Sequence, residues 1–342
     1  MPTPPACGQH FSPLHERHKN CFLIGNIVSA SDLGGERFEL LARHFNVLTA
    51  ENAMKPAALQ PHKGAFVFEE ADAIVNATLA RGIKMHGHTL AWHEQSPAWM
   101  NYEGIPRDEA ITNLTVHAKT AAEHFRGRVI SWDVLNEAII DNPPNPHDWR
   151  ASLRQSPWYK AIGPEYIEIV FKAAREADCE AKLYYNDFNL DNQNKAIAVY
   201  TMVKELNAAN TRAGGRPLID GIGMQGHYCL STKPADVAQS LERFACLGVE
   251  VSVSELDVQA GENFCLTEAQ AAEQACMFAA LFKVFIACAG RIARVTFWGL
   301  DDEASWRSAS SPLLFDKNLI AKPAFYAVEN PTAAAICPVF LP

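Results

Sequence analysis

The feature that most constrains the fold is a regular alternation of short β-prone runs with longer amphipathic helical patterns. Eight runs rich in aliphatic and aromatic residues fit strands, and they span residues 21–28, 45–51, 82–90, 128–137, 181–187, 218–227, 248–255 and 294–300. Helical patterns lie between them, for example at 69–82, 109–125, 164–178 and 268–290. Strands that alternate with helices form a parallel sheet, and eight is the number that closes into a barrel. The pattern therefore predicts an α/β fold, a (β/α)8 TIM barrel, with an open doubly wound sheet as the alternative.

The same pattern indicates one domain. The 342 residues are enough for two average domains, but a single barrel of about 250 residues or more fits this length equally well. Neither a low-complexity tract nor a Pro/Ser-rich linker divides the chain, and the Pro-rich segment 141–150 is interpreted as a long loop after the fourth strand. We predict a single barrel domain over residues 1–342, with its core at about 20–330 and without an accessory module.

Charge and hydropathy argue against several classes of partner. The formal net charge of −9 at pH 7 would repel nucleic acid and anionic membranes. No apolar run approaches the ~18 residues of a membrane helix, and the N-terminus carries prolines and histidines where a signal peptide needs an apolar segment. The nine cysteines never fall as CxxC, which suits free thiols in a reducing compartment. We predict a cytoplasmic protein that binds neither nucleic acid nor membrane; a secreted protein whose leader has been removed is the alternative.

Polar side chains stand at the carboxyl ends of many predicted strands. The fourth run ends in Asn136 and Glu137, and the seventh ends in Glu255. Other residues at the ends of their own runs are Glu51, His88, Asn186, His227 and Trp298. In a barrel these ends meet at one mouth, where side chains leave the packed interior. The set together predicts a functional site at the barrel mouth, although any one of these residues alone has little meaning.

Two glutamates from different strands at one mouth suit glycoside hydrolysis. This chemistry needs a proton donor for the leaving oxygen and a carboxylate against the anomeric carbon. It also needs flat apolar faces for sugar rings, which the tryptophans at 92, 99, 298 and 306 can supply. A surface ion pair at a strand end is the alternative for either glutamate. Neither Glu137 nor Glu255 has a Lys or Arg within the four positions that follow it, so the local sequence offers no such partner.

Two short motifs point to other chemistry but lack its structural context. The segment GIGMQG at 221–226 satisfies GxGxxG, yet it lies inside a predicted strand rather than between a strand and a helix. His86 and His88 form an HxH pair, but further metal ligands at a recognisable spacing are missing. We therefore predict no metal and no cofactor. A sugar-binding barrel without catalysis remains an alternative, although a mere binder has no need of two such glutamates.

Taken in chain order, these segments resemble the endo-β-1,4-xylanases of glycoside hydrolase family 10, from about residue 20 to residue 330. The matching segments are ENAMKP, GHTLAWH, WDVLNEA, SPWYKAIGPEYI, YYNDFN, MQGHY, VSVSELDV and WGLDDEASWR. The resemblance implies a retaining mechanism, with Glu137 as acid/base and Glu255 as nucleophile, and carboxyls about 5–5.5 Å apart. At that separation we expect the charge on Glu255 to raise the pKa of Glu137 and to keep it an acid.

The resemblance also implies which residues surround the substrate. They are Glu51, Asn52, Lys55, His88, Trp92, Asn136, Asn186, Gln225, His227, Trp298 and Trp306. Among these, Asn136 is expected to bind the 2-hydroxyl of the −1 sugar, and Trp298 and Trp306 are expected to form an aromatic floor and lid. Behind them, Asp257 is expected to anchor His227, and Asp133 is a candidate supporting residue.

The implied substrate is xylan or xylo-oligosaccharide. The wall from Glu51 to Lys55 is expected to crowd the hydroxymethyl group of glucose, which favours xylosides over the β-glucosidic alternative. A cytoplasmic enzyme would act on imported xylo-oligosaccharides rather than on polymer. The chain departs from the family pattern at His86, where many relatives carry Arg or another residue, and at Phe188, where a tyrosine is usual.

Overall fold

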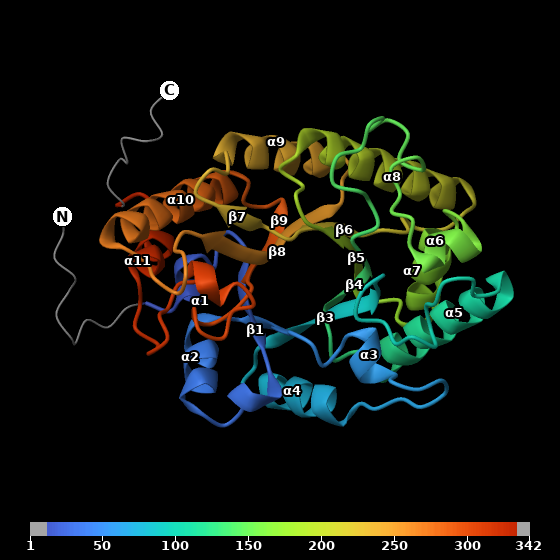
Figure 1. Ribbon diagram of the computed structural model, residues 1–342, viewed down its shortest axis with the longest axis horizontal. Coiled ribbons are helices and arrows are strands. Elements are labelled where there is room, and N and C mark those ends of the chain that lie inside the picture. Colours follow the sequence, from blue (N-terminus) through green and yellow to red (C-terminus); the bar gives the residue numbers. More distant parts are fainter. Residues whose placement is uncertain (1–11, 334–342) are drawn as a thin grey trace.

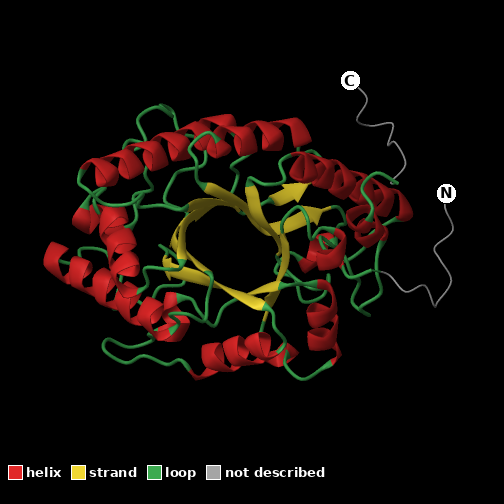
Figure 2. Ribbon diagram, turned by 180° about the vertical axis from the view of Figure 1, so that it is seen from behind, coloured by secondary structure: helices red, strands yellow, loops and turns green. Residues whose placement is uncertain are grey.

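The strands form a closed parallel ring with helices around it, which Figure 2 shows end-on. The computed structural model describes residues 12–333, so both ends of the predicted 1–342 domain lie outside the described residues. Within that range the strands are β1 (Leu23–Val28), β2 (Val47–Ala50), β3 (Lys84–Ala91), β4 (Ser131–Asn136), β5 (Lys182–Asp187), β6 (Gly221–Met224), β7 (His227–Cys229), β8 (Glu250–Gln259) and β9 (Ile292–Phe297).

Strand pairing closes the ring. β1 pairs in parallel with β2 on one side and with β9 on the other, while β6 pairs with β8. The order is therefore continuous from β1 through β6, β8 and β9 back to β1, with β7 added alongside β8. The predicted (β/α)8 barrel is confirmed, and the open doubly wound sheet is wrong.

Helices cover the outside of the ring (Figure 1). In the described range they are α1 (Leu14–Arg17), α2 (Glu36–His44), α3 (Pro56–Leu59), α4 (Glu69–Ala80), α5 (Arg107–His124), α6 (Pro157–Ile162), α7 (Tyr166–Ala177), α8 (Gln193–Arg212), α9 (Pro234–Ala245), α10 (Glu268–Ala287) and α11 (Pro323–Glu329), with 3-10 turns η1 (Ala30–Asp32) and η2 (Ser308–Ser310). Side-chain caps start two of the longest. Asn192 accepts from the N–H groups of Asn194 and Lys195 ahead of α8, and Thr267 forms a capping box with Gln270 at α10.

One predicted strand is divided in the structure. The run 218–227 is a strand only over β6, because Gly226 takes a left-handed φ of 81° and turns the chain out of the ladder. The chain then resumes pairing at β7, where His227 stands opposite Asp257. β8 extends to Gln259 rather than ending at residue 255, so that it can accept this partner.

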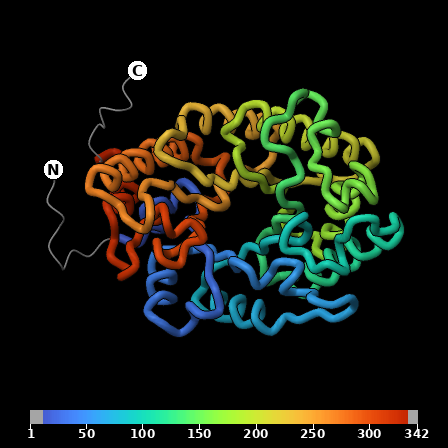
Figure 3. The backbone as a smooth tube through the Cα atoms, viewed as in Figure 1, coloured from blue at the N-terminus to red at the C-terminus, as the bar shows by residue number. Residues whose placement is uncertain are grey.

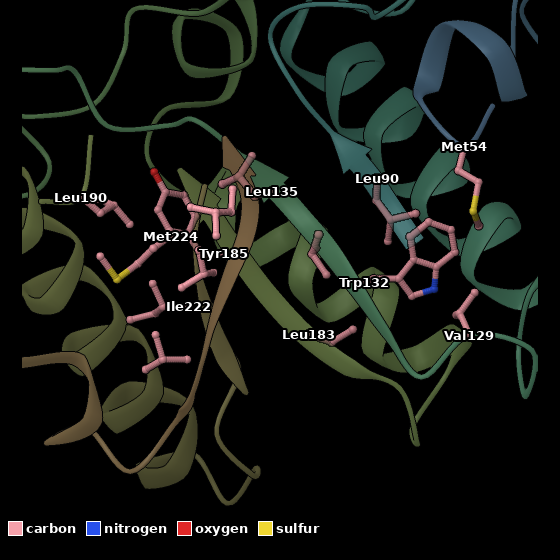
Figure 4. Close-up of a cluster of buried hydrophobic side chains, with 14 of the residues drawn as sticks. Met54, Leu90, Val129, Trp132, Leu135, Leu183, Tyr185, Leu190, Ile222 and Met224 are labelled. Atoms are coloured by element: carbon pink, nitrogen blue, oxygen red, sulfur yellow. The ribbon is translucent and has the colours of Figure 1, made fainter. Parts of the chain in front are cut away.

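Apolar side chains fill the space between the ring and its helices, and Figure 4 shows part of this core. Trp132 of β4 is fully buried there, beside Leu90 and Val129. The neighbouring position on β3 is Gly87, where a Cβ atom would overlap the Trp132 indole. A glycine at this position therefore lets the two strands pair while the large ring lies across them.

The first and last described parts of the chain lie side by side, as the blue and red segments of Figure 3 show. The pairing of β1 with β9 joins them at the ring. Outside the ring, Nε2 of His18 lies 2.9 Å from the carbonyl oxygen of Val328. The ring is therefore closed by pairs such as Leu23 and Arg294, and the contact outside it joins residues 310 positions apart.

Among residues 12–333, one helix, α10, is long and apolar enough to cross a membrane when judged by length and composition alone. The expectation that no apolar segment approaches the length of a membrane helix is therefore wrong for α10. Its Met277, Phe278, Leu281 and Phe282 are buried in the core, so this helix uses its apolar residues to cover the barrel. Core helices commonly pass such a test, because apolar content serves both environments.

Candidate active site

Glu137 follows the last residue of β4 on a left-handed turn. Its φ is 59°, a conformation that costs free energy in non-glycine residues and is concentrated at functional sites. The Glu137 N–H donates to the Asn186 carbonyl oxygen at 2.9 Å, and Arg154 Nε donates to the Glu137 carbonyl oxygen at 3.1 Å. On the carboxyl, Oε2 accepts from Trp92 Nε1 and Oε1 accepts from Gln225 Nε2, both at 2.9 Å. These contacts fix both the turn and the direction of the carboxyl.

Glu255 lies on β8 and is 5% exposed. Its Oε1 accepts from Asn186 Nδ2 at 2.7 Å, and its Oε2 lies 3.2 Å from His227 Nε2. Its N–H donates to the carbonyl oxygen of Gln225 at 2.7 Å. The two carboxylate oxygens therefore each have a donor, and the backbone of the strand is tied to the loop after β6.

Three amides connect the two carboxyl groups. Asn136 Oδ1 accepts from Asn186 Nδ2 at 3.0 Å and from Gln225 Nε2 at 3.3 Å. Because Asn186 also donates to Glu255 and Gln225 also donates to Glu137, a single network sets the positions of both acids. Asn186 is fully buried in this network, and Ser254 Oγ donates to its Oδ1.

The environments of the two carboxyls favour opposite protonation states. Burial raises the pKa of Glu137 to about 7, and the charges of Asp187 and Glu255 add to the rise. Burial also favours the neutral form of Glu255, but the hydrogen bond from His227 and the charges of His88 and His227 outweigh it and lower its pKa. The expected effect of Glu255 on Glu137 is present, but burial and Asp187 both contribute more. An acid and a carboxylate therefore coexist in one site.

His227 lies between two carboxylates. Its Nδ1 is 2.8 Å from Asp257 Oδ2, and Arg307 Nη1 donates to the other oxygen of Asp257 at 3.3 Å. Burial disfavours the imidazolium, but the charge and hydrogen bond of Asp257, together with those of Glu255, outweigh it and raise the pKa of His227 to about 9. At neutral pH a charged imidazole therefore donates to both Asp257 and Glu255.

Asp133 lies inside the barrel beneath His88. Its Oδ2 is 2.9 Å from His88 Nδ1 and 3.0 Å from His86 Nε2, and Arg294 Nη2 is 2.8 Å from the same nitrogen of His86. Burial and the nearby Arg294 lower the pKa of His86 to about 4. His86 thus faces the barrel interior, where Arg294 supplies the cation. Within residues 12–333, no group of three or more His, Cys, Asp or Glu side chains is arranged to hold a metal ion.

The segment after β2 approaches Glu137 and Glu255 through Lys55. Lys55 Nζ donates to Asn52 Oδ1 at 2.9 Å and lies 5.3 Å from the centroid of the Trp92 ring. Burial lowers the pKa of Lys55, while the charges of Glu255, Glu51 and Glu137 oppose this effect. Trp92 therefore contacts Glu137, Lys55 interacts electrostatically with both acids, and Glu51 and Asn52 lie beside Lys55.

The two tryptophans of the last loop differ in exposure. Trp298, just after β9, is 7% exposed, and the His88 ring packs edge-on to it at 5.2 Å. Trp306 is 58% exposed, with the His227 ring on one side at 5.1 Å and the Arg307 guanidinium 4.4 Å from its centroid. Trp298 is thus part of the packed floor, and Trp306 presents an open ring at the rim.

Several residues that support the site were not singled out from the sequence. Near Glu137 they are Tyr185, Asp187 and Lys195, together with Arg154 at the Glu137 carbonyl. Elsewhere in the site they are Ser254 at Asn186, Arg294 at His86 and Arg307 at Asp257. A signal existed for Asp187, since it follows Asn186 at the end of an apolar strand as Glu137 follows Asn136. The basic residues come from other elements, and no local pattern marks them.

This arrangement can act on a glycosidic bond. A buried protonated carboxyl can donate to a leaving oxygen, and an ionised carboxylate on the same network can attack the carbon that loses it. Tryptophans and amides around the pair suit sugar rings and hydroxyls. The fold and the site together define a glycoside hydrolase. The chain belongs to glycosyl hydrolase family 10, whose family model matches residues 13–331.

Known proteins are similar to this chain over nearly its whole length. Endo-1,4-beta-xylanase A of Thermoanaerobacterium saccharolyticum is 40% identical over 337 residues, which cover 94% of this chain but 28% of that protein. Beta-1,4-xylanase of Dictyoglomus thermophilum is 39% identical over 339 residues, covering 94% of this chain and 92% of that protein. The chain therefore spans under a third of the first relative and nearly all of the second.

Solved structures agree with the barrel. The crystal structure of TsXylA, an intracellular xylanase of Thermoanaerobacterium saccharolyticum, matches with a TM-score of 0.85 at 39% identity, covering 94% of this chain and 99% of that one. A glutamate-to-alanine mutant of the same enzyme, in complex with xylotetraose, matches with a TM-score of 0.84 at 39% identity, covering 92% and 98% of the two chains.

Proposed function

We propose that the protein is an endo-β-1,4-xylanase that hydrolyses β-1,4-xylosidic bonds of xylan or xylo-oligosaccharides by a retaining double displacement. The observation that carries the proposal is the pairing of Glu137 and Glu255 on one amide network, in environments that favour a protonated and an ionised carboxyl. The names of the similar proteins support the xylan-derived substrate class.

In the first step, a carboxylate oxygen of Glu255 attacks the anomeric carbon and forms a glycosyl ester. The bond to the leaving oxygen breaks as Glu137 transfers its proton to that oxygen. Trp92 and Gln225 direct the Glu137 carboxyl, while His227 and Asn186 hold that of Glu255. The hydrogen bonds are already made before the reaction, so little reorganisation is needed at the transition state.

In the second step, Glu137 is ionised and takes a proton from water, whose oxygen attacks the same carbon. The ester bond breaks, Glu255 leaves as a carboxylate, and Glu137 is again protonated. Two inversions give net retention of the β configuration. His227 stabilises the departing carboxylate, because its imidazolium lies against Oε2.

The surrounding residues would position the sugar. Asn136 would bind the 2-hydroxyl at the −1 subsite, where a hydrogen bond strengthens as the oxocarbenium ion develops. Glu51, Asn52 and Lys55 would bind the sugars before the cleaved bond, and this crowded wall would disfavour the hydroxymethyl group of β-glucosides. Trp306 would cover the sugar with its exposed ring. Asn186, being fully buried, would act through its bond to Glu255 rather than by touching sugar.

The protein is further proposed to act in the cytoplasm on xylo-oligosaccharides. The similarity to an intracellular xylanase supports this location. A cytoplasmic enzyme meets only fragments small enough to be imported. Rates per bond should accordingly be several-fold higher on short oligomers than on polymeric xylan, and equal rates on the two would contradict this part of the proposal.

A product analysis tests the activity itself. Wild-type protein is incubated with xylohexaose, and the products and their anomeric configuration are followed by NMR and chromatography, with cellohexaose as the comparison. Internal cleavage with β-anomer appearing first is expected. First appearance of the α-anomer would exclude retention, faster cleavage of cellohexaose would exclude the xylose preference, and binding without cleavage would show a sugar-binding barrel.

A further inference from the structure

A buried ion pair lies behind the acid/base glutamate and takes no part in the mechanism above. Asp187 is the last residue of β5, and Lys195 lies in the first turn of α8. Both side chains are fully buried, with Lys195 Nζ 2.8 Å from Asp187 Oδ1. The same Nζ lies 3.2 Å from Asp141 Oδ1 and 3.8 Å from the centroid of the Phe188 ring. An ion pair buried this deeply is costly to maintain, so its position invites a functional explanation.

The pair is connected to the turn that presents Glu137. Tyr185 donates its hydroxyl hydrogen to Asp187 Oδ2, and the hydroxyl oxygen accepts from Ala138 N at 3.0 Å and from Ile139 N at 3.1 Å. Figure 4 shows the Tyr185 ring among apolar side chains, which fix its direction. The two amides belong to the residues directly after Glu137. Ile139 N also donates directly to Asp187 Oδ2 at 3.4 Å. Asp187 therefore holds the backbone that continues from the left-handed turn both through the Tyr185 hydroxyl and by this direct bond.

Asp187 also places a negative charge near Glu137. After burial, this charge is the largest contribution to the raised pKa of Glu137 and exceeds that of Glu255. Burial raises the pKa of Asp187 itself, while Lys195, the Tyr185 hydroxyl and Arg154 oppose that rise. Tyr166 faces the same group from α7, and burial followed by the Asp187 charge raises the Tyr166 pKa as well.

We propose that Asp187 is a positioning residue for proton transfer by Glu137, acting through the Tyr185 hydroxyl on the following turn and through its own charge, which Lys195 stabilises. The proposal deepens the retaining mechanism and rests on the proposed function. The proposal also gives Asp187 a role in the second step. When Glu255 is esterified its charge disappears, but the charge of Asp187 stays, so Glu137 remains a strong enough base to activate water.

The test compares Asp187→Asn with wild type on aryl β-xylobiosides. A phenyl leaving group needs protonation, whereas 2,4-dinitrophenolate leaves without it. We expect the alkaline limb of kcat/KM to move down by about one pH unit, because a like charge is removed from beside the acid. We also expect kcat/KM to fall about 10–100-fold on the phenyl substrate and less than about threefold on the dinitrophenyl substrate.

Asp220→Asn is the matched control. Asp220 is another largely buried carboxylate that pairs with an arginine, Arg175, but it stands just before β6 at the opposite end of the barrel. This variant should leave both the alkaline limb and the ratio between the two substrates unchanged. A similar shift in Asp220→Asn would mean that any lost ion pair produces the effect, and this would overturn the proposal.

Tyr185→Phe gives a second, smaller change in case Asp187→Asn fails to fold. This variant removes the Tyr185 hydroxyl but leaves the charge of Asp187. We therefore expect kcat/KM on the phenyl substrate to fall at least about tenfold, while the alkaline limb stays near its wild-type pH. Equal losses on the two substrates in either variant would show a general structural role and would overturn the proposal. If wild type itself cleaves neither xylobioside, the proposed function fails first.

Discussion

Nε2 of His227 lies 3.2 Å from Oε2 of Glu255, and the imidazole is held there by Asp257 on its other nitrogen. The pKa of His227 is raised to about 9 by these carboxylates against the effect of burial, so the ring is charged when Glu255 must be ionised. This relationship makes the charge of the proposed nucleophile depend on a neighbouring side chain.

Replacing His227 with Ala should raise the pKa of Glu255. The hydrogen bond and charge that now lower it would be lost, while burial would continue to favour the neutral acid. We expect the acid limb of kcat/KM to move upward and the value at its optimum to fall about 10–100-fold. His44→Ala removes a buried histidine far from Glu255, and it should lower stability without moving the acid limb.

The alkaline limb of kcat/KM should report Glu137. Only the protonated form can donate, and its pKa is raised to about 7, so activity is expected to be full below that pH and to be lost as pH rises through it. Wild type should show this limb on a phenyl xylobioside, which needs the acid. In Glu137→Gln no proton can be lost, so the residual activity of the variant on the same substrate should show no such limb. An unchanged alkaline limb in that variant would assign the ionisation to another group.

Asn186→Asp should impair the nucleophile. Asn186 Nδ2 now donates to Glu255 Oε1 at 2.7 Å, and a carboxylate there would replace the donor with a like charge. We expect the pKa of Glu255 to rise and kcat at neutral pH to fall at least about tenfold. Asn207→Asp is the control, because Asn207 also makes paired hydrogen bonds, but to the backbone of Ile219 before β6. A pH profile identical in the two variants would contradict the role of Asn186.

The two tryptophans should separate substrate binding from stability. Trp306 is 58% exposed, so Trp306→Ala should raise KM on xylo-oligosaccharides several-fold and leave the melting temperature nearly unchanged. Trp298 is 7% exposed, so Trp298→Ala should also lower the free energy of unfolding by about 3–5 kcal/mol. Thermal melts and xylotriose kinetics on both variants measure this. Equal melting temperatures in the two would contradict the packing described here.

The fold was predictable because its signal repeats. All eight predicted runs overlap an observed strand, since periodic apolar runs separated by amphipathic helices recur along the entire chain. The division of 218–227 was missed because it depends on one glycine. Gly226 adopts a φ of 81°, and nothing in the run itself shows which of its three glycines leaves the strand.

The site was predictable only where residues end strands. Asn136, Glu137 and Glu255 follow from strand position, and the structure joins them through amides as one network. The left-handed turn at Glu137 gave no signal, because the residue is not a glycine. The sequence does not predict the roles of Lys195 and Arg154, because they reach the site from a helix and a loop through contacts that only the folded chain creates.

The assignment of the nucleophile is tested most directly by chemical rescue. Hydrolysis of an aryl β-xylobioside is measured for wild type and for Glu255→Ala, with and without azide. Azide can enter the space left by the carboxylate and attack the anomeric carbon with a single inversion. We expect an inactive variant whose activity azide restores, with α-xylobiosyl azide as the product. A variant that keeps its activity without azide, or that yields the β-azide, would contradict the assignment of Glu255.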